Sequence, residues 1–289
     1  MNNYLDQIES ILSFANRSQN TIKAYKTYTA PFFEYCVHSL GKDPAQATPS
    51  DIRTFLLKLA DERKLCDASI NHAISEIRFF YEAVLGAEWN AAQVPHRHAK
   101  NVLPYVPSRE EVRIFLSSIE DLKKKAMVCL MYSAGLRIGE VCRLKCSDIQ
   151  HSKGRIHVAP SKNSRDRYAV LSENMYRLLC DYWRALPDGM KTRDWLFTQQ
   201  HCTGKHIYPQ FIQDFIPKQE ARLGLPHRLT PHSFRHAYAT HSYMSGIRIE
   251  DLSLLLGHAS TDNTRIYIHL AQMGAGIRRH KSPMEGMEV

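Results

Sequence analysis

One stretch of the chain, residues 87–107, lacks the regular spacing of apolar residues found on both sides of it. Prolines stand at positions 95, 104 and 107, and proline favours extended or turning backbone over regular helix. We therefore expect a linker over residues 89–107, between a first domain at 1–88 and a second at 108–289. The length of 289 residues suits two domains.

The first domain has the apolar spacing of amphipathic helices joined by short loops. One helix is expected over residues 18–39, where Pro31 should kink or interrupt it. Another begins at Thr48, because a threonine cap followed by proline is typical of a helix start. A further helix covers residues 68–85. This part is predicted to be entirely helical.

Helices also dominate the second domain, and one β insertion interrupts them. Residues 155–159 and 168–171 are short runs of strand-forming composition, and the polar stretch between them contains Lys162. This pattern predicts a β-hairpin with a basic tip. The predicted fold class is therefore mainly α, with a small β-sheet or hairpin in the second domain.

The positive charge of the chain is confined to one region. The formal net charge is +9, yet residues 1–103 hold 11 basic and 11 acidic side chains, so the whole excess lies beyond them. This asymmetry suggests that the second domain meets a polyanion. No apolar run approaches the roughly 18 residues of a membrane span, and the N-terminus lacks the pattern of a secretory signal. We expect a cytoplasmic protein.

Two segments place cations where they could act on a phosphate. In Gly135-Leu136-Arg137-Ile138-Gly139-Glu140, a preceding apolar helix would hold Arg137 rigidly, as a phosphate clamp requires. The alternative is a surface arginine paired with Glu140. At the hairpin tip, Lys162 could lie in a DNA groove beside a leaving oxygen, or it could be an ordinary solvated lysine.

A third segment, Thr230-Pro231-His232-Ser233-Phe234-Arg235-His236, is typical of a helix start. His232 and Arg235 would lie on one face, beside backbone N–H groups that already favour an anion. The row His232, His236 and His241 also permits a metal site. Zinc peptidases need a glutamate after the first histidine, and Ser233 stands there instead, so we expect no metal.

The fourth segment is Leu254-Leu255-Leu256-Gly257-His258, followed nine residues later by Tyr267. Gly257 would end a helix and leave His258 on a turn, and a short helix would carry Tyr267. Tyrosines are usually core or interface aromatics, and this chain has 14 of them. Only the combination of segments sets Tyr267 apart.

These segments, in this order over residues 108–270, resemble the tyrosine recombinase, or phage integrase, family. The first domain, through Asn20-Thr21-Ile22-Lys23-Ala24-Tyr25, resembles that family's helical, SAM-like core-binding domain. The tip around Lys162 departs from the family pattern because it lacks glycine, which bears on its shape. The resemblance implies seven catalytic or supporting residues: Arg137, Glu140, Lys162, His232, Arg235, His258 and the nucleophile Tyr267.

The resemblance also implies a site-specific recombinase that cuts and rejoins double-stranded DNA through a 3′-phosphotyrosyl bond, without metal, ATP or other cofactor. Its partners would be DNA, three further copies of the chain in a homotetramer, and in some settings accessory DNA-bending proteins; off DNA the chain would be a monomer or dimer. Action at the nucleoid would follow. The alternatives are type IB topoisomerase-like cleavage and religation, a DNA-binding protein without catalysis, and a metal-dependent hydrolase.

Overall fold

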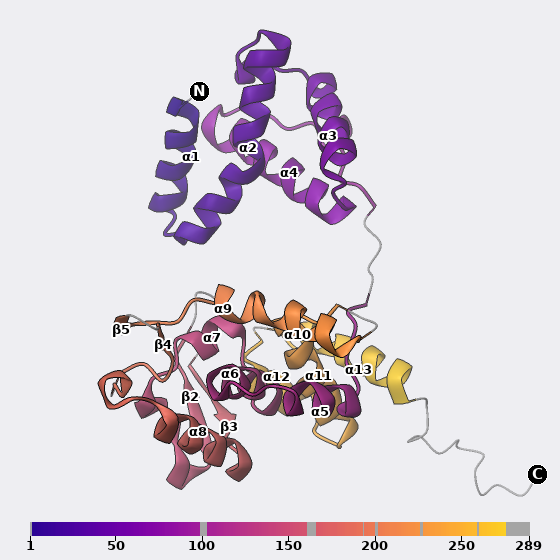
Figure 1. Ribbon diagram of the computed structural model, residues 1–289. Helices are drawn as coiled ribbons and strands as arrows, with labels where there is room; N and C mark the ends of the chain where they lie inside the picture. Colours follow the sequence, from indigo (N-terminus) through magenta and orange to yellow (C-terminus); the bar gives the residue numbers. More distant parts are fainter. Residues whose placement is uncertain are drawn as a thin grey trace, which may run out of the picture. The chain divides into compact units, whose positions relative to one another are not determined.

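The computed structural model describes residues 2–98, 103–160, 166–192, 194–199, 202–225, 228–258 and 260–275. The chain forms two compact units, Met1–Val102 and Leu103–Val289 (Figure 1). The division falls inside the predicted linker. The beginning of that segment packs on the first unit, where Val94 is buried and the Arg97 amide donates to Asn71 Oδ1 at 2.7 Å.

The first unit consists of helices around one apolar core. Aromatic side chains fill its centre, with Phe33 and Phe80 edge to face at a centroid distance of 4.6 Å. The elements are α1 (Asn2–Phe14), α2 (Gln19–Leu40), the 3₁₀ turn η1 (Pro44–Gln46), α3 (Pro49–Arg63), α4 (Asp67–Phe79) and the π-helical turn η2 (Phe80–Val84).

Helix α2 runs through Pro31 without interruption, so of the kink or interruption expected there the interruption is absent. Side chains supply hydrogen bonds just before the proline. Glu76 of α4 accepts the Tyr28 amide at 2.8 Å, and the Thr29 hydroxyl donates to the Tyr25 carbonyl at 2.6 Å. Burial raises the pKa of Glu76 to about 7, although these amide bonds oppose the rise. Tertiary contacts have thus overridden the local preference of proline.

The second unit is built around α6 (Leu122–Ser133), which is almost wholly apolar along its buried length. Helix α6 packs against α8 (Glu173–Ala185) and α11 (Pro231–Met244), and α11 packs in turn against α12 (Ile249–Leu256) and α13 (Asp262–Ala275) (Figure 1). The remaining helices are α5 (Arg109–Ser117), α7 (Ile138–Cys142), α9 (Gln210–Gln213) and α10 (Phe215–Leu223), with 3₁₀ turns η3 (Cys146–Asp148), η4 (His151–Lys153) and η5 (Asp188–Met190).

The β structure is more extensive than the predicted hairpin. Strands β2 (Arg155–Val158) and β3 (Arg167–Val170) pair antiparallel as expected, with Ile156 opposite Ala169. A short strand β1 (Ile149–Gln150) extends this sheet to three strands, in the order β1-β2-β3. A separate pair joins β4 (Thr198–Gln199) to β5 (Cys202–His206). Lys162 and the rest of the tip lie outside the described residues.

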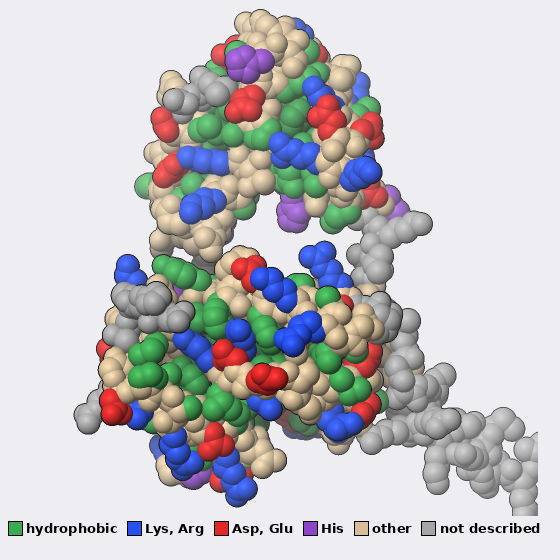
Figure 2. Space-filling model, viewed as in Figure 1, with side chains coloured by type: hydrophobic (Ala, Val, Ile, Leu, Met, Phe, Trp, Pro, Cys, Tyr) green, Lys and Arg blue, Asp and Glu red, His purple; other side chains and the backbone are tan. Residues whose placement is uncertain are grey.

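The second unit carries charged side chains of both signs on its surface (Figure 2). Figure 2 shows Lys and Arg side chains spread over its visible face, with acidic side chains among them. In the described part of the chain, no helix combines the length and the apolar character needed to cross a membrane.

Candidate active site

Two of the three arginines of the site lie at helix starts. Thr230 caps α11, where its hydroxyl accepts the Ser233 amide, and Pro231 occupies the first turn. Proline costs nothing at that position because its missing N–H would have no partner inside the helix. Helix α11 therefore begins as the sequence predicts. Arg235, one turn along it, points into the protein and is 3% exposed.

The other arginine, Arg137, is the N-cap of α7, and its amide donates to Glu140 Oε2 at 2.8 Å. Gly135 makes the turn from α6 to α7, with φ at +64°. A Cβ at Gly135 would lie 2.4 Å from the Tyr238 ring, so no larger residue fits there without movement. The turn leaves the Arg137 side chain about one-third exposed.

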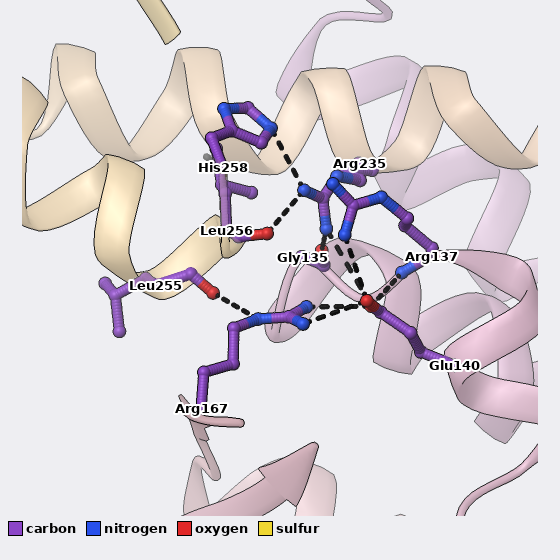
Figure 3. Close-up of polar contacts among 8 residues, drawn as sticks. All are labelled: Gly135, Arg137, Glu140, Arg167, Arg235, Leu255, Leu256 and His258. Carbon is purple, nitrogen blue, oxygen red and sulfur yellow. Dashed lines mark hydrogen bonds and ion pairs between the residues drawn. The ribbon is translucent and has the colours of Figure 1, made fainter. Parts of the chain in front are cut away.

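The carboxylate of Glu140 lies at the centre of three guanidiniums (Figure 3). Arg167, at the start of β3, donates to both oxygens at 2.9 and 2.7 Å, and Arg137 Nη1 donates to Oε1 at 3.0 Å. Arg235 Nη1 is 3.9 Å from Oε2. Burial opposes ionisation of Glu140, yet the bonds from Arg167 prevail and lower its pKa to about 2. One negative charge thus faces three positive ones.

Arg235 is held by backbone carbonyls on both sides. Its Nη1 donates to Gly135 O at 2.5 Å and its Nη2 to Leu256 O at 2.7 Å (Figure 3). Burial, followed by the charge of Arg137, lowers the pKa of Arg235 to about 10, which still leaves it cationic at neutral pH. The surplus positive charge of the cluster is suited to a phosphate diester.

His258 follows Gly257, which ends α12 in the left-handed conformation as the sequence predicts. Nε2 of His258 lies 3.1 Å from Arg235 Nη2, and Nδ1 lies 2.7 Å from the Thr264 hydroxyl. Because an arginine can only donate, Nε2 is the acceptor and Nδ1 carries the proton. Burial and the nearby Arg235 lower the pKa of His258 to about 4.

Tyr267 lies on α13 and is 2% exposed. Its hydroxyl is 3.2 Å from Nδ1 of His236, and its ring stacks on His258 with centroids 6.4 Å apart. Burial raises the pKa of Tyr267, while the charges of Arg235 and Arg137 oppose the rise. The tyrosine hydroxyl is therefore placed within the field of both arginines.

The structure brings five of the seven predicted residues into one cluster: Arg137, Glu140, Arg235, His258 and Tyr267. His232 lies one turn before His236, with ring centroids 6.3 Å apart, and is exposed. Lys162 lies outside the described residues.

Sequence reasoning missed two residues of this cluster, Arg167 and His236. Arg167 stands on the inward face of β3, and a charged residue at an inward position of a strand could have signalled a buried partner. The sequence pattern places His236 only in a row of histidines and gives no sign of its contact with Tyr267.

The histidine row does not assemble. His236 faces Tyr267, whereas Nδ1 of His241 lies 3.1 Å from the hydroxyl of Tyr132. Within the described ranges, no group of three or more His, Cys, Asp or Glu side chains is arranged to hold a metal ion.

Comparison with known proteins extends over both units. Residues 108–273 match the phage integrase family, and residues 4–91 match the phage integrase N-terminal SAM-like domain. The tyrosine recombinase XerA of Pyrococcus horikoshii is 29% identical over 91% of this chain and 87% of its own length.

Solved structures agree. A XerA recombinase crystal structure is 26% identical, with a TM-score of 0.54 and coverage of 97% of this chain and 100% of that one. The XerH recombinase bound to palindromic difH after cleavage gives a TM-score of 0.73 at 20% identity, covering 96% and 85%, which shows the shared fold. The predicted fold class and family resemblance are confirmed: the chain belongs to the phage integrase family of tyrosine recombinases.

Proposed function

We propose that this chain, a site-specific DNA recombinase by family, cuts and rejoins DNA with Tyr267 as its nucleophile. The observation that carries the proposal is the buried Tyr267 hydroxyl beside a cluster in which three guanidiniums share one carboxylate. Such a cluster can stabilise the negative charge that develops on a phosphate as it is attacked.

In the proposed reaction, the Tyr267 oxygen attacks phosphorus in line, forms a 3′-phosphotyrosyl bond and displaces a 5′-hydroxyl. Arg235 uses three of its five N–H donors in hydrogen bonds to Gly135, Leu256 and His258. The two remaining N–H groups can bind non-bridging phosphate oxygens. Arg137, with its side chain about one-third exposed, supplies further donors. The covalent bond keeps the energy of the broken ester, so that another 5′-hydroxyl can attack it without ATP.

Three further roles are carried over from the family resemblance. Lys162 would protonate the leaving 5′-oxygen, because an ammonium desolvated among cations has a lowered pKa. The exposed His232, in the first turn of α11, would either take the tyrosine proton or bind a phosphate oxygen. His258 would hold Arg235 in place and add a hydrogen bond.

The proposed partner is double-stranded DNA, and recombination would use four copies of the chain. The relative XerH was crystallised on its palindromic difH substrate, and the basic excess of residues 104–289 suits a phosphate backbone. Accessory DNA-bending proteins and a cytoplasmic, nucleoid-associated place of action belong to the same proposal.

The test is covalent trapping on a nicked suicide substrate, whose cleaved end diffuses away and prevents religation. Tyr267→Phe should abolish the adduct and leave DNA binding intact. Tyr243→Phe is the matched control and should still form the adduct, because Tyr243 packs against the apolar cluster that contains Tyr267. An adduct with Tyr267→Phe would refute the assignment. Relaxation of supercoiled DNA without exchanged strands would instead favour the topoisomerase-like alternative.

A further inference from the structure

The attack by Tyr267 poses a problem of proton transfer. Its side chain is 2% exposed, so bulk water does not reach the hydroxyl freely. The proton must therefore pass to a side chain of the protein or to the substrate. Among the described residues, the hydrogen-bond partner of this hydroxyl is His236, with Nδ1 at 3.2 Å.

The other two histidines of the site are less suited to receive this proton. Both ring nitrogens of His258 are occupied, Nε2 by the guanidinium of Arg235 and Nδ1 by Thr264. His232 is exposed and forms no hydrogen bond with Tyr267 in the described structure. Its ring faces His236 instead, at 6.3 Å between centroids.

The protonation state of His236 suits a proton acceptor. Burial, with His232 and Arg235 nearby, lowers its pKa to about 4, so the ring is neutral at neutral pH and Nδ1 can offer a lone pair. The His236 ring is half-buried.

We propose that His236, and not His232, accepts the phenolic proton of Tyr267 during DNA cleavage; this inference rests on the function proposed above. As the Tyr267 oxygen bonds to phosphorus, its O–H bond breaks and the proton moves to Nδ1. The P–O5′ bond breaks at the same time, and the leaving oxygen takes a proton from the general acid. Religation reverses each step, with His236 returning the proton to the tyrosine.

The electrostatics of the complex support this transfer. The charged or titratable groups that face His236 are His232 and Arg235 on its own helix, Tyr267 on α13 and His258 after α12. A bound phosphate diester would bring a negative charge into this group. That charge would raise the affinity of His236 for a proton at the moment the tyrosine must lose one.

The decisive variant is His236→Asn, because asparagine can keep a hydrogen bond near the Nδ1 position but cannot carry a proton at neutral pH. Single-turnover cleavage of the suicide substrate should fall by about 10²–10⁴-fold, the usual contribution of general acid–base catalysis, with DNA affinity unchanged. The rise of the rate with pH that reports the wild-type base should also disappear.

A matched control lies on the same helix. His241→Asn alters a histidine that also bonds a tyrosine hydroxyl, that of Tyr132 at 3.1 Å, away from the nucleophile. It should cleave at a rate within a few-fold of wild type. Thermal unfolding of both variants reports folding. If His236→Asn is poorly folded, His236→Ala with free imidazole decides: restored cleavage supports the proposal, and unrestored cleavage by folded protein overturns it.

A chemically altered substrate separates His236 from the general acid. A 5′-bridging phosphorothiolate releases a thiolate, which needs no proton, so it should rescue Lys162→Ala but not His236→Asn. Wild-type-like rate and pH dependence in His236→Asn would overturn the inference while leaving Tyr267 as nucleophile. Failure of wild type to form any adduct would instead overturn the proposed function.

Discussion

Arg167 and Glu140 form a buried, two-pronged ion pair, with N–O distances of 2.9 and 2.7 Å. The same guanidinium donates from Nε to the carbonyl of Leu255 at 2.9 Å (Figure 3). One side chain therefore ties β3, the start of α7 and the end of α12 together. The contacts of Arg167 therefore link the β2–β3 hairpin to Arg137 and to the turn that bears His258.

Removal of the Arg167 charge should destabilise the second unit. In Arg167→Met the buried Glu140 keeps Arg137 but loses its bidentate partner, and breaking a buried pair from one side costs about 3–5 kcal/mol. We expect a loss near the lower end of that range, because Arg137 still donates to Glu140. Denaturant unfolding, monitored through a signal from the second unit, measures this loss of stability.

An exposed ion pair in the same unit provides the control. Arg177 and Glu173 lie 3.3 Å apart, with side chains 71% and 56% exposed. Solvent screens such a pair, so Arg177→Met should cost less than about 1 kcal/mol. Equal losses of unfolding free energy in the two methionine variants would mean that the contacts of Arg167 do not stabilise the second unit.

Gly135 should tolerate alanine less well than another glycine of the same backbone conformation. Gly135 and Gly224 have φ of +64° and +61°, but a Cβ meets the Tyr238 ring at 2.4 Å in the first and nothing within 4 Å in the second. Gly224→Ala should cost about 1 kcal/mol in unfolding free energy, whereas Gly135→Ala adds overpacking of about 1–3 kcal/mol. It should also slow cleavage, because Gly135 O positions Arg235. Similar losses of unfolding free energy in Gly135→Ala and Gly224→Ala would contradict the predicted clash with Tyr238.

Local sequence signals predicted the helix ends that frame the site. The Thr230–Pro231 start, the left-handed Gly257 and the β2–β3 pairing each depend on a few neighbouring residues, and each is present. These are the features that position Arg235, His258 and the hairpin. Local chemistry was sufficient there because caps and tight turns are decided within one helical turn.

The features that could not be predicted depend on residues far apart in the sequence. Arg167 meets Glu140 across 27 positions, and His236 meets Tyr267 across 31. Near Pro31, Glu76 accepts the amide of Tyr28 across 48 positions. Neither hydrophobic periodicity nor helix-capping patterns predict contacts between residues so far apart in the sequence. They follow only from how α11, α12, α13 and β3 pack.

Arg137 should be needed for its shape as well as its charge. Arg137→Lys keeps a cation but loses the planar donors that can bond both Glu140 and a phosphate oxygen. Single-turnover cleavage should fall by about 10²–10³-fold, as when one donor to a developing oxyanion is removed, with little change in DNA affinity. Arg222→Lys, at an exposed position of α10, is the control. Full activity of Arg137→Lys would show that charge alone suffices.

His236 and His258 should make stability fall with acid. Their folded pKa values are about 4, below the ordinary 6.5, so between those values the unfolded chain binds more protons than the folded one. Their contribution to the free energy of unfolding is complete above about pH 6.5 and is lost as the pH falls towards 4. Urea unfolding across this range measures the slope, and a variant with asparagine at both positions should flatten it.

His157 should act with the opposite sign, which allows the two effects to be separated. It lies between Asp148, at 3.0 Å from Nδ1, and Asp166, at 2.7 Å from Nε2, and the bond to Asp148 raises its pKa. Its contribution to the free energy of unfolding is complete below the pKa of this histidine in the unfolded chain. The contribution is lost as the pH rises through its pKa in the folded protein. His157→Asn should therefore steepen the acid loss of stability in urea unfolding. An unchanged slope would mean that the two carboxylates do not hold the histidine in its charged form.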